Sequence, residues 1–192
     1  MPIRQDPLIP GEHYHIYNRG INSETVFRSN RNYTFFLRKI EEILIPQTAA
    51  LIAYVLMPTH FHLLVQIKNE DFSSAIGRII NSYTKACNRD WERTGPLFEG
   101  RFKAKHVDTD EYLLELSRYI HLNPISASLV SKPEDWLYSS YAAIIDRNSE
   151  TLLVVDVILS YFDHTDPIIA YQQFVEETSK HKLSLISHLL FD

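Results

Sequence analysis

Apolar and polar positions along this chain follow patterns that predict a succession of strands and helices. Residues 13–20, HYHIYNRG, alternate and stop at a glycine, which predicts a strand. Residues 31–44 carry apolar side chains at helical spacing, which predicts a helix. The apolar stretch 49–67 is interrupted by Met57-Pro58-Thr59, where proline favours a tight turn between two strands.

The next part of the chain repeats this alternation of helix and strand. Residues 71–93 predict a long amphipathic helix, and the glycine-punctuated segment 95–108 predicts a loop that leads into a short strand. Residues 109–123 predict a further helix, which Pro124 is expected to stop. The order β-α-β-β-α-β-α favours an α+β fold, a ferredoxin-like antiparallel sheet flanked by helices.

Length and composition suit a single soluble domain with an appendage. We expect one domain over residues 1–145 and an acidic, helical C-terminal extension over 146–192, with helices in the apolar segments 151–162 and 183–191. No run of about 18 apolar residues occurs, and the N-terminus lacks the apolar stretch of a signal peptide. Cytoplasmic residence is therefore expected.

Charge is distributed unevenly along the chain. The net charge is −5, but the first 133 residues carry +2 and the remainder carries −7. Residues 76–106 hold seven cations and three anions. A local basic cluster can bind phosphates even in an acidic protein. A solvated helix face explains the same cluster equally well.

The candidate chemistry begins with a pair of histidines in the second strand of the 49–67 stretch. His60 and His62 are one residue apart, so a strand points both imidazoles to the same face. Buried imidazoles need polar partners, and a metal ion satisfies two at once. Structural histidines with protein partners are the alternative, and such a pair arises easily by chance among nine histidines. A second pair, His13 and His15, has the same spacing but lacks the apolar setting, so we interpret it as a chance match.

The helix over 109–123 adds two polar side chains. Tyr119 and Asn123 are four residues apart and hence neighbours on one helix face, where a phenol and a carboxamide oxygen could share a cleft. A tyrosine that packs with its hydroxyl at the rim is the commoner case. Spacing alone does not choose Tyr119 over Tyr83 or Tyr112. Cys87 is the only cysteine, which excludes disulfides and cysteine-rich zinc sites.

Three segments together carry a resemblance to a known family. YVLMPTHFHLLVQ, NSYTKACNRDWERTGPLFEGRFKAKHV and YLLELSRYIHLNPISASLV, in this order, resemble the IS200-type tyrosine transposases, and most closely the branch associated with repetitive extragenic palindromes (REP). The resemblance spans residues 11–142. It implies a ferredoxin-like fold, a histidine-hydrophobe-histidine metal motif at His60 and His62, a nucleophile at Tyr119 and a third metal ligand at Asn123. Family members often carry Asn where Thr59 stands.

The implied activity is cleavage and transfer of single-stranded DNA, often recognised through a hairpin. Mg²⁺ or Mn²⁺ would polarise the scissile phosphate, and Tyr119 would form a 5′-phosphotyrosine link. Monomer and homodimer remain open, as do a hairpin-binding relative that does not cut and a phosphodiesterase that uses water. The cations expected to contact the DNA backbone are Arg78, Lys85, Arg89, Arg101, Lys103 and Lys105.

Overall fold

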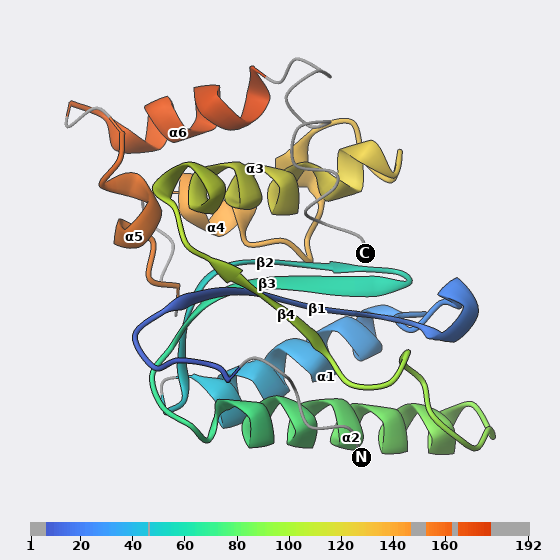
Figure 1. Ribbon diagram of the computed structural model, residues 1–192. Coiled ribbons are helices and arrows are strands. Elements are labelled where there is room, and N and C mark those ends of the chain that lie inside the picture. The colour runs from blue at the N-terminus through green and yellow to red at the C-terminus, as the bar shows by residue number, and fades with distance from the viewer. Residues whose placement is uncertain (1–6, 46, 147–152, 163–164, 178–192) are drawn as a thin grey trace.

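The computed structural model describes residues 7–45, 47–146, 153–162 and 165–177, and its centre is a four-stranded antiparallel sheet (Figure 1). The strands are β1 (His13–Arg19), β2 (Ala49–Met57), β3 (His60–Ile67) and β4 (Lys103–Val107), in the order β2-β3-β1-β4. This order and the intervening helices confirm the predicted ferredoxin-like fold.

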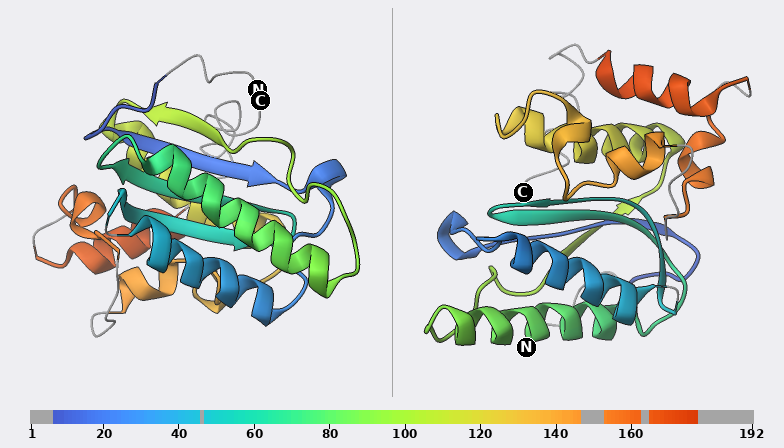
Figure 2. Two further views of the ribbon diagram at one scale, coloured as in Figure 1. Left: turned by 90° about the horizontal axis from the view of Figure 1, so that it is seen from below. Right: turned by 180° about the vertical axis from the view of Figure 1, so that it is seen from behind.

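Two helices cover one face of the sheet. They are α1 (Asn30–Lys39), which continues into a π-helical turn at Ile40–Leu44, and α2 (Phe72–Asp90). Figure 2 shows them side by side across the strands. The apolar stripes of the two helices form a core with the strand side chains that face them, among them Ile16, Phe61 and Val65. Phe98 and Phe102 are buried in this core as well.

The opposite face is covered by α3 (Asp110–Ser126) and by elements from the C-terminal part of the chain (Figure 1). These are the 3-10 turn η3 (Pro133–Asp135), α4 (Tyr141–Ile145), α5 (Asp156–Leu159) and α6 (Pro167–Glu176). A second core joins Leu113, Leu116 and Ile120 of α3 to β2 and to apolar side chains of α4, α5 and α6. No helix of the described residues is long and apolar enough to cross a membrane.

Two sequence predictions about helices need correction. Pro124 does not stop α3, which runs on to Ser126. A proline lacks one amide donor and clashes with the preceding turn, so α3 tolerates it only near its end: it stops two residues later, where the Ala127 amide still bonds to the Asn123 carbonyl.

The helix predicted over residues 151–162 forms only in part. Its described residues contain only the four-residue helix α5, because Leu153 instead forms an isolated parallel bridge with Leu51 of β2. The helix predicted over 183–191 lies outside the described residues.

Gly20 follows β1 at a point where the next segment of the chain packs closely against it. A Cβ there would lie 2.3 Å from the Glu24 carbonyl oxygen and 2.7 Å from Cγ1 of Val26, whereas a Cβ at Gly77 in α2 meets nothing within 4 Å. We expect Gly20→Ala to lower the free energy of unfolding by about 1–3 kcal/mol. Gly77→Ala, the control, should raise it by about 0.5–1 kcal/mol. Urea unfolding measures both, and equal effects of the two substitutions would contradict this packing.

Candidate functional site

The site lies on the α3 side of the sheet, where β1 and β3 are paired. Tyr17 is directly opposite His62 in the register of the two strands, and Arg19 is opposite His60. Because side chains alternate between faces, His60 and His62 point toward α3 while Phe61 points into the α1–α2 core. Both histidines therefore lie on one strand and point to one face of the sheet, as the sequence predicted.

Each imidazole of the pair is engaged at Nδ1 by a neighbouring residue. His60 Nδ1 lies 2.9 Å from the Thr59 hydroxyl, and His62 Nδ1 lies 2.8 Å from Nε2 of His15. The other nitrogen of His60, Nε2, lies 3.3 Å from Oδ1 of Asn123. These contacts orient both rings through Nδ1 and leave Nε2 as the nitrogen suited to a ligand in the site.

Burial also determines the charge state of these rings. Desolvation lowers the pKa of His60. Desolvation also lowers the pKa of His62, and the neighbouring His15 and His60 lower it further. The pKa of His15 falls to about 3, mainly through complete burial. Neutral imidazoles are the form that binds a metal ion.

Tyr119 and Asn123 reach the pair from α3. The Tyr119 ring stands edge-on to that of His62, with 5.4 Å between the ring centroids. Burial raises the pKa of Tyr119, a hydrogen bond with Asn123 lowers it, and the nearby Tyr17 raises it further. The hydroxyl is therefore a neutral phenol at ordinary pH, and its deprotonation needs help from a neighbouring positive charge.

The far face of α3 is fixed by buried polar contacts. The Tyr171 hydroxyl of α6 lies 2.6 Å from Nδ1 of His121 and 3.2 Å from the Ser117 hydroxyl. Nε2 of His121 lies 2.8 Å from the Ser140 hydroxyl. Such directional contacts define one rotation of a helix about its axis more strictly than apolar packing does. They hold the side of α3 that carries Tyr119 and Asn123 toward the sheet.

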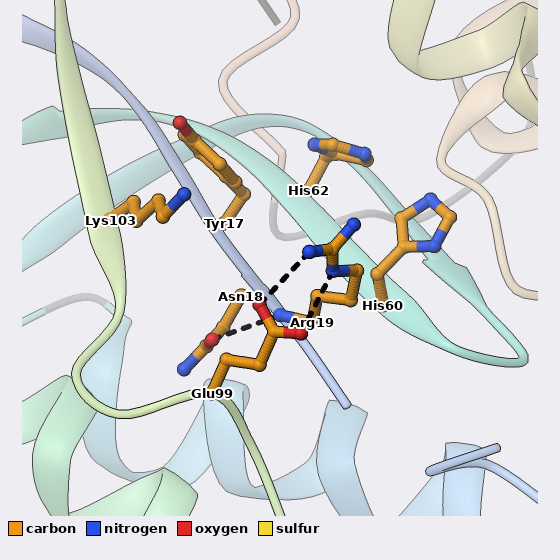
Figure 3. Close-up of a pocket in the computed structure, with 7 residues that line it drawn as sticks. All are labelled: Tyr17, Asn18, Arg19, His60, His62, Glu99 and Lys103. Carbon is orange, nitrogen blue, oxygen red and sulfur yellow. Dashed lines mark hydrogen bonds and ion pairs between the residues drawn. The ribbon is translucent and has the colours of Figure 1, made fainter. Parts of the chain in front are cut away.

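A small pocket of about 100 Å³ opens beside the histidine pair. Figure 3 shows Tyr17, Arg19 and Lys103 around the two imidazoles. The Arg19 guanidinium makes two hydrogen bonds to the Glu99 carboxylate, of 3.1 and 3.2 Å, and this fork holds it at the pocket's edge. The pocket lining therefore carries two cations and one carboxylate next to the imidazoles, a net positive charge that favours an anionic ligand.

The structure divides the predicted DNA-binding cations between the two faces of the sheet. Lys103 and Lys105 belong to β4 and share the face of the histidine pair, where they are paired in register with Tyr17 and His15. Arg101 is exposed just before β4. The exposed cations of α2, on the other side of the sheet, are Arg78, Lys85 and Arg89.

Two residues of the site were missed in the sequence. The sequence pattern makes the pair His13 and His15 look like a chance match, yet His15 contacts His62. The contact could not be predicted because the register of β1 against β3 cannot be read from either strand alone. Arg19 was left out of the cationic candidates although it lies opposite His60. The arginine directly after the alternating segment 13–18 was the available signal for a charge at the end of that strand.

The donor set fits a divalent cation. Among the described residues, no three His, Cys, Asp or Glu side chains form a group that could hold a metal ion. The carboxamide oxygen of Asn123, which lies 3.3 Å from His60 Nε2, could serve as a third ligand beside the two imidazoles. Two imidazoles and an amide oxygen suit Mn²⁺ and also Mg²⁺, whose remaining positions are commonly taken by water and phosphate oxygens.

Fold and site together define a class of protein: a ferredoxin-like domain with a histidine pair on its central strand, facing a helical tyrosine. The family profile described as "Transposase IS200 like" matches residues 10–123. The chain therefore belongs to the IS200-like transposase family, which confirms the resemblance found in its sequence.

Two individual proteins are similar to this chain. One is from Haemophilus influenzae (strain ATCC 51907 / DSM 11121 / KW20 / Rd) and is described as "Putative REP-associated tyrosine transposase". It is 29% identical over 101 residues, which is 47% of this chain and 57% of that protein, so the chain spans little more than half of its relative's length. The other is a solved structure of a REP-associated tyrosine transposase bound to a REP hairpin, with a TM-score of 0.64 and 19% identity, covering 79% of this chain and 90% of the other. At this identity the second likeness supports the fold.

The buried histidines predict a pH dependence of stability. Burial lowers the pKa of His15 and of His121 from 6.5 to about 3. Below pH 6.5 these two histidines are therefore protonated in the unfolded chain but stay neutral in the folded chain. The free energy of unfolding should fall with pH in this range, by roughly 1.4 kcal/mol per pH unit for each such histidine. Urea unfolding in EDTA at about pH 7.5 and about pH 5.5 measures it, and His15→Phe should show a shallower dependence. Identical midpoints for the unsubstituted protein at the two pH values would refute the assignment.

Proposed function

We propose that this protein is a metal-dependent tyrosine transposase that cleaves single-stranded DNA beside a hairpin through a covalent 5′-phosphotyrosine intermediate. One observation carries the proposal: Tyr119 and Asn123, one helical turn apart on α3, lie directly against His62 and His60 of β3. Membership of the IS200-like transposase family supports the same reaction class.

The roles of the residues follow from their positions. His60, His62 and Asn123 would hold a divalent cation, and the chemistry that this cation would supply is polarisation of the scissile phosphate and stabilisation of negative charge on a phenolate. Tyr119 gives up its proton and attacks the phosphorus. The P–O3′ bond breaks, the departing 3′ oxygen takes a proton from solvent in place of the one that Tyr119 released to solvent, and the 5′-phosphate stays on Tyr119. The phosphodiester energy is kept in this link, so the strand can be rejoined without ATP.

The basic side chains around the pocket bind the phosphates of the DNA backbone. Arg19 and Lys103 flank the histidine pair, and Lys105 continues along the same strand face. Phosphates that follow this path meet cations on the face that carries Tyr119, which suits a single strand leading into the site. The hairpin is proposed as a partner because the structurally similar transposase is described as bound to a REP hairpin.

A covalent-adduct assay tests the nucleophile. Hairpin DNA with single-stranded flanks, labelled at its 3′ end, is incubated with protein and Mn²⁺ and run on a denaturing gel. A 5′-phosphotyrosine link predicts a slow protein–DNA band from the 3′ label and a shorter free product from a 5′ label. Tyr119→Phe should lose the band completely, since it removes the hydroxyl of the tyrosine that stands edge-on to His62.

Tyr112→Phe is the matched control. Tyr112 lies on the same helix, is buried, and has a pKa that burial raises to about 12, but it belongs to the apolar core of α3. Its substitution should leave the adduct intact. Cleavage without an adduct would favour a phosphodiesterase that uses water, and hairpin binding without cleavage would favour a relative that only recognises DNA.

Salt dependence tests the proposed path of the strand. We expect Lys103→Gln to weaken binding of single-stranded DNA and to reduce the slope of log K against log[salt] by about 1, because one phosphate contact is lost. Arg78→Gln, which removes a cation from α2 on the other side of the sheet, is the comparison. Fluorescence anisotropy over a salt series measures both, and a larger effect of Arg78→Gln would place the strand on the α2 face instead.

A further inference from the structure

A third histidine, outside the expected ligand set, stands behind the pair. His15 lies on β1, two residues from Tyr17, and its side chain is fully buried. Its Nε2 lies 2.8 Å from Nδ1 of His62, and the two rings are nearly parallel with 5.0 Å between their centroids. The His15 ring also stacks on Tyr17, with 4.6 Å between the ring centroids. His62 is therefore held by a hydrogen bond and by ring contacts at once.

This burial is costly for a residue that serves packing alone. Nδ1 of His15 is buried and has no hydrogen-bond partner among the described residues. An unpaired buried polar atom destabilises a fold, whereas an apolar ring of similar size at this position would pack without that penalty. The compensating feature is the contact of the other nitrogen with His62.

The direction of this contact has a chemical consequence. If the Nδ1–H of His62 donates to His15, then His62 presents its Nε2 lone pair on the opposite side of the ring, toward the site. The Thr59 hydroxyl contacts the same nitrogen of His60, at 2.9 Å. The two imidazoles of the pair are thus contacted at the same nitrogen by different partners, one from β1 and one from the β2–β3 turn.

We propose that His15 is a positioning residue for the metal site: it fixes the tautomer and the ring orientation of His62 and thereby raises the affinity of the site for a divalent cation. This inference rests on the metal site of the proposed function. His15 binds neither metal nor DNA itself. Partners that orient a ligand in this way typically contribute 10–100-fold to metal affinity.

Metal binding, rather than activity, tests the inference. Mn²⁺ is titrated into each variant, with and without hairpin DNA, and free Mn²⁺ is followed by electron paramagnetic resonance. We expect His15→Phe to weaken binding by roughly 10–100-fold. His15→Gln should restore most of the affinity, because its amide oxygen can accept the same hydrogen bond. His13→Gln is the matched control, since His13 lies on the same strand face beside Glu12, Asp110 and His106, and its substitution should leave the affinity unchanged.

The outcomes separate this inference from the function on which it rests. If the unsubstituted protein binds Mn²⁺ and His62→Ala abolishes binding, the metal site stands. Unchanged affinity in His15→Phe, or an equal loss in His13→Gln, would then overturn the role of His15 alone. If the unsubstituted protein binds no Mn²⁺ in either condition, the metal site fails and the inference fails with it.

A second measurement is independent of whether His15→Phe folds. Long-range ¹H–¹⁵N spectra of the unsubstituted protein report which nitrogen of each imidazole carries the proton. The inference predicts a protonated Nδ1 and an unprotonated Nε2 for His62. The opposite tautomer would overturn it.

Discussion

The antiparallel pairing of β1 with β3 in the middle of the sheet determines which side chains meet beneath α3. In this register Tyr17 is opposite His62 and Arg19 is opposite His60. A slip of one residue would turn the β1 side chains to the other face and would put Ile16 and Asn18 beside the histidines. The slip is prevented because the alternate positions of both strands, Ile16 and Phe61 among them, fill the core under α1 and α2. Packing on one face of the sheet thus positions polar groups on the other.

The second half of the site depends on how α3 is held. Its apolar stripe packs on β2, but a stripe alone permits some rotation and sliding. The contacts of His121 with Tyr171 and Ser140 add directional constraints from α6 and from the segment before α4. Arg118 adds another, since its guanidinium stacks on the Phe174 ring at 3.6 Å. The C-terminal part of the chain therefore supports the helix that carries Tyr119, in addition to extending the core.

Much of this architecture was predictable from local patterns. Alternation identified β1 and β3, and period two placed His60 and His62 on one face without knowledge of the fold. Other features depend on contacts between distant segments. Spacing alone does not choose Tyr119 over Tyr112 and Tyr83, and only the family resemblance names it. The fold adds that Tyr83 points into the α1–α2 core, where its hydroxyl donates to the Val26 carbonyl. His15 could not be linked to His62 because the two are 47 positions apart and the sequence between them carries no signal of strand register.

The local rules failed where tertiary contacts outweighed them. Pro124 is a helix breaker by its own chemistry, but α3 is already anchored on the sheet and on α6, so its last turn forms despite the lost donor. Leu153 lies in an apolar segment that favours a helix, but pairing with Leu51 at the edge of the sheet takes precedence. The roles proposed for His60, His62, Tyr119 and Asn123 rest on proximity and on family membership.

The central claim is that the fold brings one particular tyrosine to the histidine pair as a nucleophile. Peptide mapping of the trapped protein–DNA adduct tests it most directly: the complex is digested with nuclease and protease, and mass spectrometry locates the nucleotide on the chain. The account predicts a 5′-phosphonucleotide on Tyr119 within the sequence of α3. A nucleotide attached to Tyr17, Tyr112 or any residue outside α3 would contradict it.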